Sequence, residues 1–293
     1  MTSPCLADEE LGKLYSTYYP RRQIDSSELI AAASKVTGTY ARLQRWLAGT
    51  DNQGQYSIRP GQIMLDVGCG SGLSLLEAKN LGGLPYGIEA DPNVRGIAKK
   101  LGLQIHIGSL YDHPFPGVAF DLVVLNQVIE HIPDPGRTLT ELRERLKPGG
   151  RIILIFPNRA SFWRLMFGSR WINWHIPYHL HHFDAEAFAA LARRSGYRIL
   201  KQRTITPNLW TTLQFRMPRQ RKLGVPSPLW NATANEHADS GLPRVSRSLG
   251  PGRILRAVFR RAAFMIRALT NRIIDLTGYG DSIFVVLVNE NGS

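Results

Sequence analysis

The sequence is short of cysteine, of long apolar runs and, in one region, of acidic residues, and each shortage excludes a class of protein. Only Cys5 and Cys69 occur among 293 residues, too few for a disulfide framework, which indicates a reducing compartment. No uncharged apolar run reaches the roughly twenty residues that a membrane-spanning helix needs. The first ten residues are polar and acidic, unlike a signal peptide, so we expect a cytoplasmic protein, either free or peripheral at the inner face of the membrane.

Acidic residues are scarce between residues 201 and 272, where fourteen lysines and arginines are accompanied only by Glu236 and Asp239. The net charge of +13 therefore belongs mainly to this region and not to the whole fold. Within it, residues 226–252 are rich in serine, proline, glycine and asparagine, which predicts a loop of low order.

Hydrophobic residues make up 43% of the chain, enough for one α/β core with added elements. The core is organised around residues 63–72, where a buried strand breaks into a G-x-G-x-G loop and a helix follows at once. A second strand over residues 84–88 ends at Glu89, where a Rossmann-type site binds the ribose hydroxyls. The glycine spacing differs from the G-x-G-x-x-G of dinucleotide sites, and Asp66 lies inside the first strand.

Further strands and helices alternate along the chain, which predicts a parallel sheet with ligands at the carboxyl ends of its strands. A helix is expected over residues 26–48, after Asp25 and before Gly49, and another from Asp184 to Ser195. The other expected helices cover residues 73–80, 93–101 and 138–146, with a turn at 147–150. The other expected strands cover residues 103–107, 120–125, 151–156, 197–204 and 282–289.

Between Ile63 and Asn158 these motifs resemble, in their order, the class I S-adenosylmethionine (SAM)-dependent methyltransferases. Glu130-His131 followed by a Pro-Asp-Pro turn is similar to the ubiquinone-biosynthesis and related small-molecule methyltransferases. The resemblance implies a Rossmann-like, seven-stranded, mostly parallel sheet with an antiparallel last strand, and SAM as cofactor. Ser109 departs from the aspartate that contacts adenine in that family. The residues that the resemblance assigns to the cofactor are Asp66, Gly68, Cys69, Gly70, Gly72, Glu89, Ser109, Leu110 and Asn126.

Four segments follow from this interpretation. Residues 1–60 form an N-terminal helical lid, in which Tyr18 and Tyr19 are either substrate-side residues or packing aromatics. Residues 61–204 form the SAM-binding core, residues 205–280 a basic insertion, and residues 281–293 contain the last core strand.

Four of the eight histidines lie between His175 and His182. A metal site is disfavoured, because Pro177 interrupts a single helical face and no cysteine or carboxylate cluster accompanies the imidazoles. Methyl transfer to a hydroxyl needs alignment and a base, for which His131, His179 and His182 are candidates. The alternative is that these histidines only hold the loop by hydrogen bonds. We expect an enzyme that methylates oxygen on a small-molecule, glycan or lipid-linked acceptor.

Residues 253–276 predict a basic amphipathic helix. Its apolar face could pack on the core or on a second subunit, or lie in an anionic membrane interface. Nucleic acid is a further partner for the arginines, and a nucleic-acid methyltransferase is the alternative function, although no N-P-P-Y-like motif follows the fourth strand and few aromatics interleave the basic residues. A nicotinamide-binding or inactive Rossmann protein fits the glycine and acidic positions less well. The oligomeric state stays open.

Overall fold

The computed structural model describes residues 25–35, 37–51, 53–216 and 251–290, without the side chains of residues 251–257. The expectations for Tyr18 and Tyr19, and for the loop over residues 226–250, fall outside this part of the chain.

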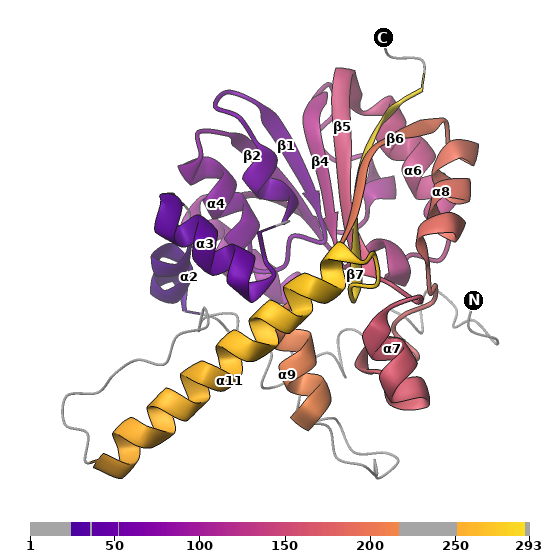
Figure 1. Ribbon diagram of the computed structural model, residues 1–293. Coiled ribbons are helices and arrows are strands. Elements are labelled where there is room, and N and C mark those ends of the chain that lie inside the picture. Colours follow the sequence, from indigo (N-terminus) through magenta and orange to yellow (C-terminus); the bar gives the residue numbers. More distant parts are fainter. Residues whose placement is uncertain (1–24, 36, 52, 217–250, 291–293) are drawn as a thin grey trace.

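A seven-stranded sheet forms the centre of the molecule, in the order β3-β2-β1-β4-β5-β7-β6 (Figure 1). Strands β1 to β5 pair in parallel, and β7 pairs antiparallel with both β5 and β6. The predicted Rossmann-like sheet with an antiparallel last strand is confirmed. The strands are β1 (Ile63–Val67), β2 (Leu84–Glu89), β3 (Gln104–Ile107), β4 (Phe120–Asn126), β5 (Leu146–Pro157), β6 (Tyr197–Ile205) and β7 (Ser282–Asn289).

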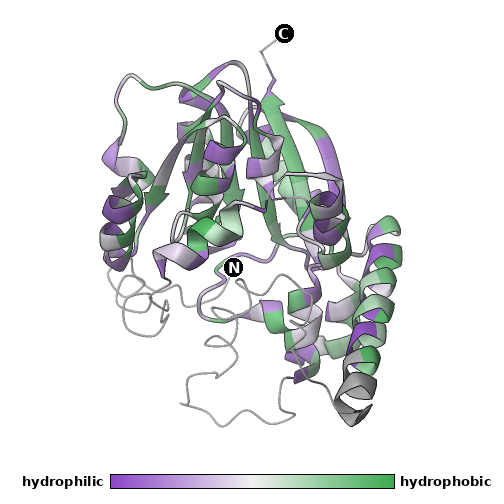
Figure 2. Cartoon of the chain, turned by 90° about the vertical axis from the view of Figure 1, so that its left-hand side faces the viewer, coloured by the Kyte–Doolittle hydropathy of each residue, from purple (hydrophilic) through white to green (hydrophobic). Residues whose placement is uncertain are grey.

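Helices cover both faces of the sheet. The side chains of β4 are apolar on both faces, because each face packs against helices. Val123 and Leu125 pack in one cluster with α6 and α8, while Leu122 and Val124 pack in the other with α4. Figure 2 shows the hydrophobic strands enclosed by helices of mixed polarity. The helices are α2 (Ser26–Ala33), α3 (Thr39–Ala48), α4 (Leu73–Asn80), α5 (Arg95–Leu101), α6 (Pro135–Glu144), α7 (Phe162–Phe167), α8 (Ala185–Arg194), α9 (Asn208–Arg216) and α11 (Pro251–Leu276).

The single helix expected over residues 26–48 is wrong, because two helices, α2 and α3, occupy this segment. Gly38 has φ of 100°, a conformation outside the helical region, and it separates them. The ends were predicted correctly: the Asp25 carboxylate accepts the N–H of Ser27, and Gly49 ends α3 in the left-handed conformation.

Other boundaries also differ from the prediction. The turn at residues 147–150 lies inside β5, where the pairing with β4 shifts from Leu146 opposite Phe120 to Arg151 opposite Leu122. Helix α6 begins at Pro135 because the Asp134 carboxylate accepts the N–H of Arg137 and caps it. Helix α9 and the early start of α11 at Pro251 were not predicted.

Asp281, just before β7, ties the aromatic segment after β5 to the sheet. It is buried, and its carboxylate accepts hydrogen bonds from Ser161 Oγ at 2.8 Å, Trp171 Nε1 at 2.8 Å and Asn173 Nδ2 at 3.0 Å. The segment that carries the clustered histidines is therefore anchored at its beginning by one side chain.

We expect Asp281→Ala to lower the free energy of unfolding by about 3 kcal/mol, because three buried donors lose their acceptor. Chemical denaturation of the full chain measures this. Glu186→Ala, which removes an exposed carboxylate on α8, is the control and should change stability by less than about 0.5 kcal/mol. Equal stability of both variants would show that the Asp281 network contributes little.

Candidate functional site

The loop after β1 is held in a left-handed conformation against the end of β2. Gly68 and Gly70 have φ of 74° and 56°, and a Cβ at Gly68 would lie 2.6 Å from Val128 Cγ2. The N–H groups of Gly68 and Cys69 both donate to the carbonyl oxygen of Ile88, at 2.8 and 3.1 Å. The glycine positions predicted from the sequence are thus required by backbone geometry.

Glu89 is buried at the end of β2, and its carboxylate is oriented by two backbone groups. Oε2 accepts the N–H of Gly70 at 2.8 Å, and Oε1 accepts the N–H of Asp91 at 3.0 Å. This arrangement suits a vicinal diol such as ribose, the role that the sequence predicts for Glu89.

A cavity of about 240 Å³ opens beside the glycine loop. Five of the residues assigned to the cofactor from the sequence line it: Asp66, Gly68, Cys69, Gly70 and Asn126. The other four, Gly72, Glu89, Ser109 and Leu110, are not in its wall. Helix α2 and the one-turn helix η1 (Gly54–Ser57) complete the wall together with α4. The lining residues that the sequence analysis missed are Glu28, Leu29, Ala32, Gln53, Gln55, Ser71, Leu73, Ser74 and Glu77.

Two buried carboxyls face this cavity, which makes it suited to a cation. Burial raises the pKa of Asp66 to about 7, although the hydroxyl of Ser74 donates to its carboxylate. Burial also raises the pKa of Glu77, which accepts hydrogen bonds from Gln55 Nε2 at 2.7 Å and Tyr56 Oη at 3.1 Å. A bound sulfonium and ammonium would stabilise both in their ionised form, so the donor set fits SAM.

Glu77 and Gln55 were missed for a physical reason. Glu77 is one polar residue on a helix, and Gln55 lies in a polar connection, so neither carries a pattern of its own. Only the packing of η1 against α4 brings the two side chains together and buries them. The two residues are 22 positions apart in the sequence, so no local pattern links them.

At the end of β3, Ser109 and Leu110 are engaged in local structure. Ser109 Oγ accepts the N–H of Tyr111 at 3.1 Å, while Asp112 Oδ2 accepts the N–H of Ser109 at 2.7 Å. This is a capping box for a short helical turn, and the buried Leu110 accepts from Arg145 through its carbonyl oxygen. The Ser109 hydroxyl keeps its proton as a donor for a ligand.

A second group of side chains gathers where β4 ends. Gln127 has φ of 56°, an uncommon value for a residue other than glycine, and the turn continues into η4 (Ile129–His131). The carbonyl oxygen of Glu130 accepts the N–H groups of Leu180 and His181 at 2.9 and 3.1 Å. These bonds fasten the histidine-rich loop onto the end of β4.

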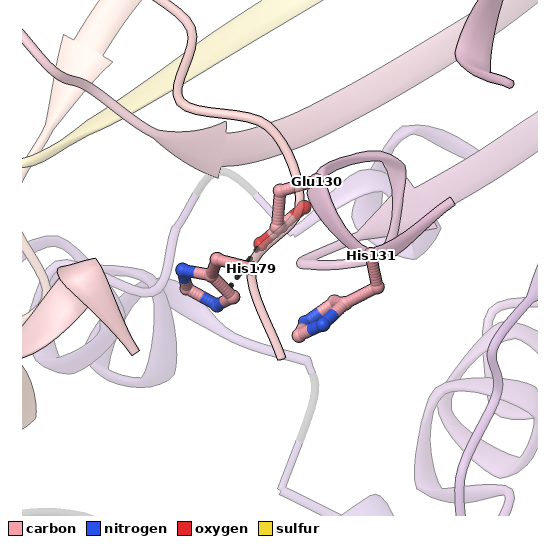
Figure 3. A group of neighbouring side chains, drawn as sticks. All are labelled: Glu130, His131 and His179. Carbon is pink, nitrogen blue, oxygen red and sulfur yellow. Dashed lines mark ion pairs between the residues drawn. The ribbon is translucent and has the colours of Figure 1, made fainter. Parts of the chain in front are cut away.

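Glu130, His131 and His179 thereby meet, as Figure 3 shows, although 48 residues separate the last two in the sequence. His131 Nδ1 lies 2.9 Å from the carbonyl oxygen of Tyr178, and His179 Nδ1 lies 2.7 Å from that of Asn173. A carbonyl only accepts, so each Nδ1 carries the proton and each Nε2 is the basic nitrogen. Neither carboxyl oxygen of Glu130 bonds to another described residue.

Burial keeps this group uncharged near neutral pH. It raises the pKa of Glu130 to about 8, lowers that of His131 to about 4, and holds that of His179 well below its ordinary value. The 4.0 Å between His179 Nε2 and Glu130 Oε1 is therefore a contact of neutral groups and not an ion pair. His182 stands apart, with its ring 6.2 Å from that of His179 and 4.9 Å from that of Trp174.

The same three residues have the donor set of a metal site. One ligand atom from each of Glu130, His131 and His179 lies within 4.8 Å of the others. Each imidazole donates its Nδ1–H to a backbone carbonyl, which leaves Nε2 as the possible ligand atom. The argument that no cysteine or carboxylate cluster accompanies the histidines overlooked Glu130, which the fold supplies from η4, just after β4. Two imidazoles and one carboxylate could hold a divalent transition-metal ion.

Comparison with known proteins agrees with this geometry. A family model described as a methyltransferase domain matches residues 39–202. The ubiquinone biosynthesis O-methyltransferase of Cereibacter sphaeroides is 36% identical over 125 residues, 40% of this chain and 51% of the relative. That of Xanthomonas euvesicatoria pv. vesicatoria is 32% identical over 153 residues, 47% of this chain and 64% of the relative. The chain thus spans about half to two thirds of the length of the curated relatives it matches.

Solved structures show the same fold at low sequence identity. The [4+2]-cyclase SpnF has a TM-score of 0.53 and 18% identity, covering 97% of this chain and 96% of its own. A chain from the complex of the Haloferax volcanii Trm112 methyltransferase activator with a methyltransferase has a TM-score of 0.50 and 17% identity, covering 89% of this chain and 97% of its own. Because the family model covers more than half of the sequence, the chain belongs to the methyltransferase-domain family, the class I enzymes whose cofactor is S-adenosylmethionine.

Proposed function

We propose that this protein methylates a hydroxyl oxygen on a small-molecule, glycan or lipid-linked acceptor. The observation that carries the proposal is the paired basic nitrogens of His131 and His179 beside Glu130, at the end of the strand that also contributes Asn126 to the cavity. The O-methyltransferase names of the two relatives support the choice of oxygen.

SAM supplies an electrophilic methyl group on a sulfonium. The chain's part is to hold that cation and to exclude water. Asp66 and Glu77 offer negative charge inside a buried wall, where a charge interaction is screened less than at the surface. Glu89 binds the ribose hydroxyls, and its own position is fixed by the Gly70 N–H.

His131 is the base in this proposal. It is partly exposed, whereas His179 is buried, so an acceptor reaches His131 first. When an acceptor hydroxyl is methylated, its proton would pass to His131 Nε2. The Nδ1–H bond to Tyr178 keeps the ring in the tautomer that can accept it.

Glu130 has a positioning and electrostatic role. A protonated His131 is costly in this poorly solvated site, and the Glu130 carboxyl within 4.8 Å offsets that cost once it is ionised, at a pH above its pKa of about 8. Glu130 also places the histidine loop through its carbonyl oxygen. His179, whose ring centroid is 4.7 Å from that of His131, packs edge to face against the base and fixes its orientation.

A panel of matched acceptors tests the proposal. The full chain is incubated with SAM and with catechols, phenols, sugars and polyprenyl phenols, each beside an analogue in which an amine or thiol replaces the hydroxyl. S-Adenosylhomocysteine is quantified. Turnover confined to hydroxyl acceptors supports the proposal, whereas turnover confined to amines, thiols or RNA contradicts it.

The affinity for SAM should depend on pH through Asp66. With a pKa of about 7 this carboxyl is mostly protonated at pH 6 and mostly ionised at pH 8, and only the ionised form attracts the cation. We therefore expect the dissociation constant for SAM to be roughly tenfold higher at pH 6 than at pH 8. Isothermal titration at both pH values measures it.

Asp66→Asn should bind SAM weakly at both pH values and lose the pH dependence. Asp184→Asn is the matched control, because asparagine also caps helix α8. The pKa of Asp184 is lowered, chiefly by the N–H of Ala187, so this carboxyl stays ionised at both pH values. If Asp66→Asn kept the tenfold difference, another group would be responsible.

A further inference from the structure

Helix α11 packs on the domain with its polar face. Asn271 and Arg272 are buried, and so is Ala268. Asn271 Oδ1 accepts from Trp163 Nε1 at 3.2 Å, and Asn271 Nδ2 donates to Asn208 Oδ1 at 2.8 Å. Hydrogen bonds, and not apolar packing, therefore set the rotation of α11 about its own axis.

Arg272 strengthens this attachment. Its Nη2 donates to the carbonyl oxygen of Thr206 at 2.6 Å and lies 2.7 Å from Asp275 Oδ2, and its Nη1 lies 3.9 Å from Asp51. A buried guanidinium with these partners cannot turn outward without leaving charges unpaired. The orientation of α11 is consequently specified.

The opposite face of α11 is apolar and exposed. Phe259, Ile266 and Ile273 are 66%, 67% and 64% exposed, on a helix whose beginning extends beyond the rest of the domain (Figure 1). Of the alternatives that the sequence left open for this face, packing on the described core is not the one that the structure adopts. The exposed apolar residues of α11 are Val258, Phe259, Met265, Ile266, Leu269, Ile273 and Leu276.

Neighbouring elements expose apolar side chains at the same end of the molecule. Leu165 and Met166 of α7 are 60% and 62% exposed, and Phe215 of α9 is 61% exposed. The three helices lie together beyond one end of the sheet (Figure 1). Trp163 of α7 contacts Phe215 of α9, with their ring centroids 5.6 Å apart. Exposed apolar surface of this extent marks an interaction site.

We propose that the apolar face of α11, at this end of the molecule, binds the surface of an anionic lipid membrane. Arg260 and Arg261 are exposed on α11, and the surrounding sequence from residue 201 to 272 has few acidic residues. An apolar face on a helix that also exposes arginines suits acyl chains and anionic headgroups. Among the described residues no helix is long and apolar enough to cross a membrane, so α11 lies in the interface.

Charge decides between the membrane and two other occupants. A second copy of this chain would bring two arginine-rich helices together without acidic partners, and like charges across an interface are unfavourable. Nucleic acid would require the arginines at the centre of the exposed face, but apolar residues occupy it and Arg272 is buried. This proposal is independent of the methylated atom.

Flotation of the full chain with vesicles tests it. Vesicles of phosphatidylcholine alone are compared with vesicles that also contain anionic phosphatidylglycerol. We expect binding to the anionic vesicles, weakened by salt. Phe259→Ser with Ile266→Ser should lower the partition coefficient at least about tenfold, because both apolar side chains leave the interface.

Leu84→Ser is the matched control, since Leu84 is 54% exposed at the start of β2, away from α11. It should bind vesicles like the unmodified chain. Absence of binding, equal binding to uncharged vesicles, or full binding by the α11 double variant would overturn the proposal. So would sedimentation showing a dimer that the double variant dissociates, because the face would then be a subunit interface.

Discussion

Gly70→Arg is expected to weaken SAM binding by more than about a hundredfold, on the order of 3 kcal/mol, while the protein stays folded. The side chain would enter the cavity that Gly70 lines and place a guanidinium beside the carboxylate that now accepts the Gly70 N–H. A fixed cation in this position competes with the cationic ligand for the same charge. Titration calorimetry with SAM and with S-adenosylhomocysteine measures the loss.

Gly102→Arg is the control for backbone strain. Gly102 has φ of 62°, close to that of Gly70, and no atom lies within 4 Å of a Cβ built there. Both variants therefore have an arginine in the left-handed conformation, which should lower the free energy of unfolding by about 1–2 kcal/mol. Undiminished SAM affinity in Gly70→Arg would refute the assignment of the loop, whereas equal loss in both would point to strain alone.

His131→Asn is expected to lower turnover with a hydroxyl acceptor by about 10²–10⁴-fold and to leave SAM affinity unchanged. Asparagine can keep a hydrogen bond to the loop but cannot take the acceptor's proton. Single-turnover formation of S-adenosylhomocysteine measures the chemical step, and titration with SAM checks that the site is intact. His179→Asn should have a smaller effect, because it disturbs the orientation of His131 only.

His113→Asn serves as the matched control. Its side chain is 72% exposed, and its left-handed φ of 50° is one that asparagine tolerates. Glu130→Gln provides a second readout: with a Glu130 pKa of about 8, the unmodified enzyme should gain rate as pH rises through 8, and the variant should not. Full turnover by His131→Asn would exclude it as the base.

A metal ion in the cluster of Glu130, His131 and His179 would change how these variants act. Both nitrogens and the carboxylate would then be ligands, and losing any one would release the ion. Metal analysis of the purified chain distinguishes the two cases. A metal site would give about one metal ion per chain, whereas a histidine that acts only as a base needs none.

The sequence alone predicted the sheet and the cofactor loop because their signals are local. Apolar strands of period and length typical of parallel pairing, the glycines that need left-handed φ, and Glu89 at a strand end are each visible within a few residues. The prediction missed the break at Gly38 and the start of α6 at Pro135, because a single glycine or a capping aspartate shifts a helix end without changing the hydrophobic pattern.

Only the tertiary structure decided which residues line the cavity, which side chains surround the histidines, and which face of α11 packs on the domain. Glu77 meets Gln55, and His179 meets Glu130, across long stretches of chain, and no periodicity encodes such a meeting. For α11 the hydrophobic pattern predicted the helix but left open which face packs on the core. Its orientation is set by a few buried hydrogen bonds and an ion pair around Asn271 and Arg272, whose partners exist only once the sheet has formed.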